Sequence, residues 1–360
     1  MTEIPLDISY KLRLRRLFWS MGYFSPLEVK LAAYAFKFGE QKRYDISDID
    51  VMGIRFEKDL QQNIIIGDCK SGSESSINRI FWLKGVMDFF EAARGYFVQP
   101  TISDHTKQVA SKLNINLLTA DNFALIENEM GIGALKLFLF DIETYKRAES
   151  LWGLDIKKGD KPTNNQLALK EIYSYLDYTF WIVEDYRNIF TIIDRATDLQ
   201  RFYQEFQEEK IKFLLYNVVI MLSISLLQMG GFILSTDRKN FVYQAREYMF
   251  GGMIELRERE LLFRKISELV KQKLTVEPTY YNELLELVNR LVKFAIYSKD
   301  IPRYLEIVLY EYVLNDSQLT FDNIFKDYSV DTLKLTKDIA VFLCNVSGID
   351  RKFFDKLLTL

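Results

Sequence analysis

The stretch NIIIGDCKSG, residues 63–72, determines how the N-terminal part of this chain is interpreted. Three isoleucines, Ile64 to Ile66, are typical of a buried strand, yet Asp68 and Lys70 follow one residue apart. Burying either charge without a partner costs several kcal/mol. The two side chains therefore form either an incidental surface pair or a functional site.

The preceding segment indicates where Asp68 points. Residues 43–57 alternate in polarity and are rich in β-branched side chains, and the polar stretch 57–62 follows as a turn, so the two strands are expected to form a hairpin. A hairpin symmetric about Asp59 sets Asp50 directly opposite Asp68. Asp48 lies on the same face as Asp50, because residues two apart on a strand share a face, and it would take that place if the register shifted by two.

Two carboxylates opposed in this way repel each other. A divalent cation between them would turn the repulsion into coordination, and Mg²⁺ accepts one or two carboxylates together with carbonyl and water oxygens. Lys70 projects to the same place and could position or deprotonate an attacking water. This pattern is typical of metal-assisted hydrolysis of phosphodiesters.

The surrounding segments predict a mixed α/β region. Ser25, Pro26 and Glu28 form a capping-box pattern that predicts a helix over 25–39. After the hairpin, the periodicity predicts a helix over 77–93, a strand over 95–101, a helix over 103–114 capped by Ser103, and a strand over 115–121.

This order of elements, with DIDVMGI at 48–54 and IIIGDCKSG at 64–72, resembles the PD-(D/E)xK, or restriction endonuclease-like, nuclease superfamily over roughly residues 20–125. The resemblance implies Asp50 and Asp68 as metal ligands, the backbone carbonyl of Cys69 as a third, Lys70 as the catalytic lysine, and Glu28 as the acidic residue of the first helix. Ile49 stands where the proline of the family motif would be.

Simpler interpretations remain for each residue. Asp68 and Lys70 could be an ion pair at a strand end, and Glu28 could be only a helix cap. The Cys69 side chain should point away from the site and pack. His105 should be a solvated residue near a helix start. Because it is the only histidine of the chain, mechanisms that need several histidines are excluded.

The chain changes character near its middle. Residues 152–165 are rich in Gly, Lys, Pro and Asn and suggest a linker. Beyond it every periodic segment predicts helix, for example the apolar positions Leu284, Leu287, Val288, Leu291, Val292 and Ala295. We therefore expect an α+β fold, with a nuclease-like domain over 1–150 and an all-helical sensing or assembly domain over 166–360.

Composition limits the partners. The net charge of −3 provides no general attraction for nucleic acid, so contacts would come from local clusters such as Lys11, Arg13, Arg15 and Arg16, with Arg79 and Lys84 after the second hairpin strand. A solvated basic face is the alternative for these residues. Cys69 and Cys344 are too few for a disulfide framework, which suits the cytoplasm.

Residues 213–234 form an uncharged stretch long enough to cross a bilayer. Two interpretations remain open for it. It is either a helix buried at the centre of the helical domain or a membrane span.

The sequence as a whole predicts a Mg²⁺- or Mn²⁺-dependent endonuclease that acts on DNA. By analogy with nucleases joined to helical domains, a role in bacterial defence against foreign DNA is expected. The helical part could bind a partner protein or a second copy of the chain. The alternatives are a non-catalytic scaffold or interaction subunit with a nuclease-like fold and, less favoured, a membrane-associated sensor.

Overall fold

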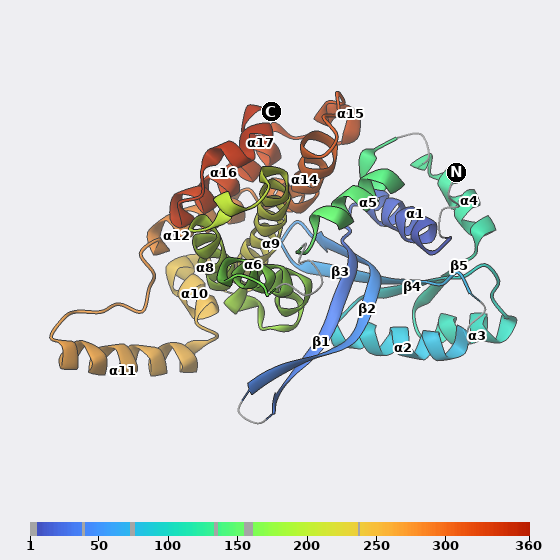
Figure 1. Ribbon diagram of the computed structural model, residues 1–360. Coiled ribbons are helices and arrows are strands. Elements are labelled where there is room, and N and C mark those ends of the chain that lie inside the picture. The colour runs from blue at the N-terminus through green and yellow to red at the C-terminus, as the bar shows by residue number, and fades with distance from the viewer. Residues whose placement is uncertain (1–5, 38–39, 73–75, 133–135, 155–160, 237) are drawn as a thin grey trace.

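The N-terminal part of the protein is built on a five-stranded sheet, seen in a computed structural model that describes residues 6–37, 40–72, 76–132, 136–154, 161–236 and 238–360. The strands lie in the order in which they occur in the chain (Figure 1): β1 (Leu27–Lys37), β2 (Glu40–Phe56), β3 (Gln62–Cys69), β4 (Arg94–Val98) and β5 (Ile115–Leu118). β1, β2 and β3 are antiparallel, and β3, β4 and β5 are parallel.

Helices cover both faces of this sheet. Helix α1 (Leu6–Ser20) lies on one face, and α2 (Ser76–Phe89) and α3 (Asp104–Lys112) lie on the other (Figure 1). Helix α1 lies close to the sheet because Gly67 faces it, where a Cβ would collide with Leu14. This close approach brings the N-terminal half of α1, with Lys11, to the end of β3.

The helix predicted over 25–39 is wrong, because this segment forms strand β1. Ser25 is buried and its hydroxyl contacts the Tyr23 carbonyl oxygen at 3.3 Å instead of capping a helix. The alternation of Leu27, Val29 and Leu31 fits the pleat, and Val29 pairs with Ile49 of β2. Pairing with a neighbouring strand has overridden the local capping signal, and the first helix is α1 instead.

The other predicted elements of this region are confirmed. The hairpin forms from β2 and β3, and α2, β4, α3 and β5 follow in the predicted order. Ser103 caps α3 by accepting a hydrogen bond from the Thr106 N–H. A mixed sheet followed by a largely helical remainder is therefore the fold of this protein.

The remainder of the described chain is helical. Its α-helices are α4 (Ala120–Glu129), α5 (Ile142–Leu151), α6 (Asn164–Ser174), α7 (Phe180–Ile182), α8 (Asn188–Gln200), α9 (Glu208–Ser235), α10 (Phe241–Met249), α11 (Met253–Val270), α12 (Tyr281–Lys293), α13 (Ala295–Ser298), α14 (Ile301–Ile307), α15 (Phe321–Ile324), α16 (Val330–Ser347) and α17 (Asp355–Thr359). Two π-helices occur, η3 (Tyr175–Thr179) and η7 (Val308–Val313). Short 3-10 turns are η2 (Phe138–Phe140), η4 (Asp185–Arg187), η5 (Tyr203–Glu205), η6 (Arg238–Asn240) and η8 (Arg351–Phe354).

Helix α9 contains the uncharged stretch 213–234 and lies at the centre of the helical part, against α8, α12 and α14 (Figure 1). Among the described residues it is the one helix long and apolar enough to cross a membrane, and most of its apolar window is buried within the protein. Glycine also has a packing role here, because a Cβ at Gly231 would collide with the backbone oxygen of Leu60 in the β2–β3 turn. This burial is what a core helix of a soluble protein shows.

The sheet and the helical part share one hydrophobic core, which includes Ile54 and Phe97 of the sheet as well as Leu222 of α9. A buried ion pair also joins them, since Arg15 Nη2 of α1 lies 2.9 Å from Glu306 Oε1 of α14. The linker expected at 152–165 lies partly outside the described residues, which omit 155–160. The boundary between 1–150 and 166–360 stays a prediction. Because the two regions share a hydrophobic core and a buried ion pair, we expect each to stabilise the other.

The apolar spacing predicted for the helical part is confirmed in α12, where Leu284, Leu287, Val288 and Leu291 are buried. Helix α11 differs, because it projects from the body of the protein (Figure 1) and exposes Ile254, Leu262 and Leu269.

Candidate active site

The register of the β2–β3 hairpin brings Asp50 and Asp68 together. Val51 pairs with Gly67 and Met52 with Ile66, so the next pair in the same register is Asp50 with Asp68. Both side chains are almost completely buried, with 4% and 2% of their surface exposed. Asp48, the alternative for a register shifted by two, is exposed instead.

Asp50 is held from two sides. Its Oδ2 accepts a hydrogen bond of 2.6 Å from the Cys69 backbone N–H, and its Oδ1 lies 3.1 Å from Lys11 Nζ. Burial raises the pKa of Asp50 to about 6, and the nearby charge of Asp68 acts in the same direction, while Lys11, Lys70 and the Cys69 N–H oppose it. Asp50 is therefore a carboxylate that takes up a proton more readily than an exposed aspartate.

Asp68 is bound by an arginine of α2, the helix that covers the sheet face opposite α1. Arg79 of α2 donates two hydrogen bonds to it, one from Nε to Oδ2 at 3.0 Å and one from Nη2 to Oδ1. The Arg79 guanidinium also lies 4.1 Å from the centre of the Trp82 ring. Lys70 Nζ lies 3.5 Å from Asp68 Oδ1 and 3.9 Å from Asp50 Oδ2, so it bridges the two aspartates.

Lys11 links Asp50 to Glu28. Its Nζ lies 3.0 Å from Glu28 Oε1 and 3.3 Å from Asp7 Oδ2. Burial alone would lower the pKa of Lys11, but the charges of Asp50 and Glu28 outweigh it and raise the pKa, so this buried lysine stays protonated. Glu28 Oε1 also accepts a hydrogen bond of 3.0 Å from the Tyr145 hydroxyl of α5.

The backbone of Glu28 has a φ of 55°, in the left-handed region that side chains other than glycine rarely adopt. Such a conformation costs about 1 kcal/mol or more and persists only where neighbouring contacts hold it. Here the contacts with Lys11 and Tyr145 provide that hold. The predicted residue Glu28 thus joins the cluster from a strand instead of a helix.

The remaining predicted residues fall as follows. The thiol of Cys69 packs in the apolar layer under α1, as expected, and burial raises its pKa well above the usual value. Its carbonyl points to the same side of β3 as its N–H, which is the side of Asp50. His105 is exposed near the start of α3, as expected.

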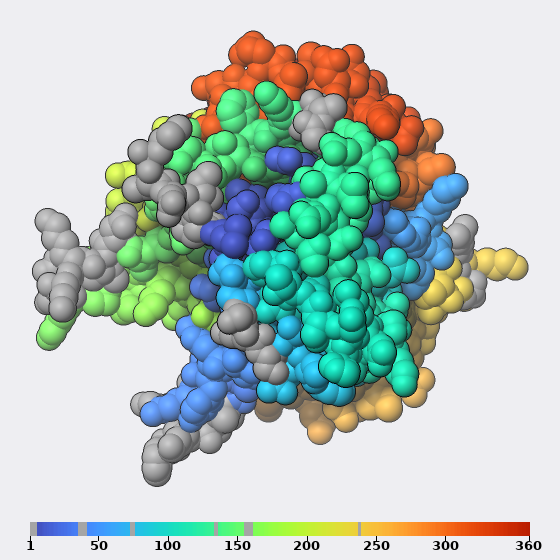
Figure 2. Space-filling view, turned by 90° about the vertical axis from the view of Figure 1, so that its right-hand side faces the viewer, coloured from blue at the N-terminus to red at the C-terminus, as the bar shows by residue number. Residues whose placement is uncertain are grey.

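Within the basic stretch at residues 11–16, the side chains of Lys11 and Arg15 are buried and point to partners inside the protein. Arg13 is also engaged, with both Nε and Nη2 donating to the Glu127 carboxylate of α4. Figure 2 looks onto this face and shows the dark-blue α1 between the green α5 and the teal α4. Lys11, Arg13 and Arg15 each form an ion pair with an acidic residue that is distant in the sequence.

Two contributors were not predicted from the sequence as part of the cluster. Lys11 and Arg79 each bind one of the paired aspartates, Lys11 from α1 and Arg79 from α2. The sequence indicates both residues only as members of a basic surface. Two buried carboxylates need more than the single positive charge of Lys70 to compensate them. This imbalance is the signal in the sequence that points to further cations at the site.

The donor types at this cluster fit a hard cation such as Mg²⁺. Two buried carboxylates and the carbonyl of Cys69 are oxygen ligands of the kind that Mg²⁺ prefers. Over the part of the chain that the structure describes, however, no three acidic, histidine or cysteine side chains form a ready metal-binding group. Arg79 occupies both oxygens of Asp68, so a cation would have to replace it there.

No protein-family model, no curated protein and no solved structure matches this chain. The functional argument therefore rests on the geometry of the cluster.

Proposed function

We propose that the protein is a metal-dependent nuclease of the PD-(D/E)xK type that hydrolyses phosphodiester bonds of DNA. The observation that supports this most is that the buried Asp50 and Asp68 lie one residue beyond the last β2–β3 pair, in the same register, with Lys70 Nζ within 4 Å of both carboxylates. Two opposed carboxylates can hold a divalent cation, and a lysine beside them can face a phosphate, which suits metal-assisted hydrolysis of a phosphodiester.

In this proposal Asp50, Asp68 and the Cys69 carbonyl hold Mg²⁺ or Mn²⁺. The cation supplies Lewis-acid stabilisation of a phosphoryl oxygen and lowers the pKa of a bound water. The Cys69 N–H fixes the orientation of Asp50, and Lys11 neutralises part of its charge. Lys70, whose side chain is 27% exposed, is the cation placed to face a phosphate or to orient the attacking water.

A second candidate function, a non-catalytic scaffold or interaction subunit, is favoured by a specific observation. Arg79 donates hydrogen bonds to both carboxylate oxygens of Asp68, and Lys11 forms an ion pair with Asp50. The negative charge of the two aspartates is therefore already offset by cationic side chains of the protein. Such a network can serve stability or specificity without catalysis.

The same proposal includes a cytoplasmic location, DNA as the substrate and a role in defence against foreign DNA. It also includes a sensing or assembly role for the helical part. The central position of α9 supports a soluble protein. The interaction of the helical part with a partner protein or a second copy is also proposed.

The deciding experiment measures cleavage of linear and circular DNA with Mg²⁺, with Mn²⁺ and with EDTA, alongside the thermal stability of the same samples. We expect cleavage only with metal, and we expect Asp68→Asn and Lys70→Ala to lose most of it while remaining folded. Mg²⁺ should raise the stability of the wild type by about 3 kcal/mol at a hundredfold excess over its dissociation constant. Asp50→Asn should lose that response.

Asp48→Asn is the matched control, since Asp48 lies on the same strand but is exposed. It should keep both cleavage and the metal response. Full cleavage in EDTA would exclude the metal mechanism. Equal stabilisation of the wild type and both Asp50→Asn and Asp68→Asn by Mg²⁺ would favour the scaffold instead.

A further inference from the structure

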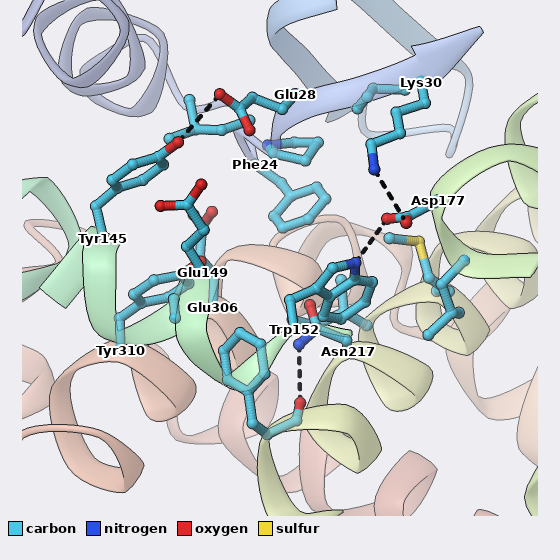
Figure 3. A pocket seen from close by; sticks show the side chains of 18 of the residues that line it. Phe24, Glu28, Lys30, Tyr145, Glu149, Trp152, Asp177, Asn217, Glu306 and Tyr310 are labelled. Carbon is cyan, nitrogen blue, oxygen red and sulfur yellow. Dashed lines mark hydrogen bonds and ion pairs between the residues drawn. The ribbon is translucent and has the colours of Figure 1, made fainter. Parts of the chain in front are cut away.

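A cavity of about 280 Å³ lies between the sheet and the helical part (Figure 3), and it shares Glu28 with the aspartate cluster. Residues from β1, α5, α9 and α14 line it. Its size is close to the lower end of the range for ligand pockets, which begins near ~300 Å³. The occupant would be a small molecule.

Both π-helices of the described chain contribute to this one cavity. Asp177 comes from η3 and Tyr310 from η7. π-helices make up well under 1% of residues and are found disproportionately at functional sites, because the extra residue in the turn redirects a side chain. Their convergence is a reason, independent of composition, to regard this cavity as a binding site.

The charges that line the cavity are mostly paired. Lys30 Nζ lies 3.4 Å from Asp177 Oδ2, Arg15 pairs with Glu306, and Glu28 pairs with Lys11. Glu149 of α5 differs, because it is an exposed residue of the lining whose carboxylate has water, and no ion-pair or hydrogen-bond partner among the described residues, to interact with. In Figure 3 the Glu149 carboxylate lies beside Tyr145, and its charge contributes to raising the pKa of the Tyr145 hydroxyl, after burial and Glu28.

One buried polar atom at the cavity has no hydrogen-bond partner among the described residues. Glu306 is fully buried, and its Oε2 has no hydrogen-bond partner. The Ser25 N–H is near enough to lower the pKa of Glu306 slightly, against the larger effect of burial, but it does not reach hydrogen-bond geometry with Oε2. Since Glu306 is paired with Arg15 and Glu28 with Lys11, the unpaired charge at the cavity is the negative charge of the exposed Glu149, which disfavours phosphates and carboxylates as ligands.

The walls between these charges are aromatic. Trp152 and Phe213 pack edge to face with their ring centres 5.9 Å apart, and Phe24, Trp181 and Tyr310 are among the other aromatic residues of the lining. Negative charge beside aromatic faces is the environment that binds organic cations, through ion pairing and cation–π attraction.

We propose that this cavity binds a small primary amine that carries an aromatic or apolar group. The ammonium lies against the exposed Glu149 carboxylate, and the apolar part lies against Trp152 and Phe24. This site does not depend on the proposed nuclease activity, although Glu28 belongs to both the cavity and the aspartate cluster.

The test uses three probes of the same skeleton on the full-length protein: phenethylamine, 2-phenylethanol and phenylacetate. Binding is followed by calorimetry and by the tryptophan fluorescence that Trp152 and Trp181 contribute. We expect phenethylamine to bind roughly tenfold more tightly than 2-phenylethanol, because the ammonium adds an ion pair and a cation–π contact. Phenylacetate should bind more weakly than either.

Glu149→Gln should remove most of the preference for phenethylamine over 2-phenylethanol. Glu143→Gln is the matched control on the same helix, because Glu143 is exposed and pairs with Lys146 away from the cavity. It should leave the preference unchanged. No binding of phenethylamine, equal binding of amine and alcohol, a preference for phenylacetate, or an unchanged preference in Glu149→Gln would each overturn the proposal.

Discussion

Asp50 accepts a hydrogen bond of 2.6 Å from the backbone N–H of Cys69, so its carboxylate is fixed to β3 beside Asp68. This contact keeps two buried acids adjacent at the point where the β2–β3 pairing ends. Lys11, Lys70 and Arg79 approach them from separate elements and offset their repulsion. The predictions below test how this cluster and the packing around it behave.

The stability of the metal-free protein should depend on the protonation of Asp50. Because its pKa is raised from 3.8 to about 6, the folded state keeps a proton that the unfolded state has lost between these two pH values. The free energy of unfolding should therefore fall as the pH rises through this window, by about 1–3 kcal/mol. Lys11 and Lys70 limit the loss, while Asp68 adds to it.

Asp50→Asn removes this titration while the Cys69 N–H still finds an oxygen to bind. Without metal the variant should melt at the same temperature as the wild type or higher at neutral pH, and the difference should shrink below about pH 4. Urea denaturation over this pH range measures it, with the exposed Asp48→Asn as the control. A pH profile of Asp50→Asn that is parallel to the wild type would show that Asp50 is not the titrating group.

Arg79→Ala should weaken the metal-free fold but strengthen metal binding. It leaves Asp68 buried with Lys70, 3.5 Å away, as the neighbouring cation, at a cost of about 1–3 kcal/mol. The same change frees both oxygens of Asp68, so Mn²⁺ or Mg²⁺ should stabilise the variant more than the wild type. Calorimetric titration and melting with metal measure both effects.

Lys84→Ala is the control for Arg79→Ala, since Lys84 lies on the same helix and pairs with the exposed Asp88. It should change stability by less than about 0.5 kcal/mol. If metal stabilises Arg79→Ala no more than it stabilises the wild type, Arg79 does not compete with a cation for Asp68.

Glu306→Gln should destabilise the whole protein by about 3–5 kcal/mol, because it leaves the buried Arg15 without its ion-pair partner. The loss should appear in a single unfolding transition that involves both the sheet and the helices, because the pair joins α1 to α14. Glu283→Gln, at an exposed position of α12, should have little effect. Independent melting of the helical part would support the predicted boundary between two separate domains.

Two glycine substitutions in helices should have opposite effects. Gly231→Ala in α9 should destabilise by about 1–3 kcal/mol, because the new Cβ would collide with the Leu60 carbonyl oxygen. Gly85→Ala in α2 has no atom within 4 Å of the added Cβ and should stabilise by about 0.5–1 kcal/mol. Chemical denaturation of the purified variants compares their free energies of unfolding. A neutral Gly231→Ala would mean that α9 does not pack against the β2–β3 turn.

The sequence by itself determined the hairpin and its register. The alternation of β2, the turn around Asp59 and the isoleucines of β3 are local signals, and together they place Asp50 opposite Asp68 because a one-residue slip would turn every apolar side chain to the wrong face. Helices α2, α3 and α12 were equally predictable, since their periodicity or capping lies within a single segment.

Only the tertiary structure decided the state of β1 and the partners of the cations. The segment that begins at Ser25 carries a helix-capping pattern and a strand alternation at once, and pairing with β2 selects the strand. Lys11 meets Asp50, Arg79 meets Asp68, and Arg15 meets Glu306 only after folding, because attraction between charges depends on distance and burial and not on separation along the chain. The same holds for the cavity at Glu149, which exists only where the sheet and the helical part pack together.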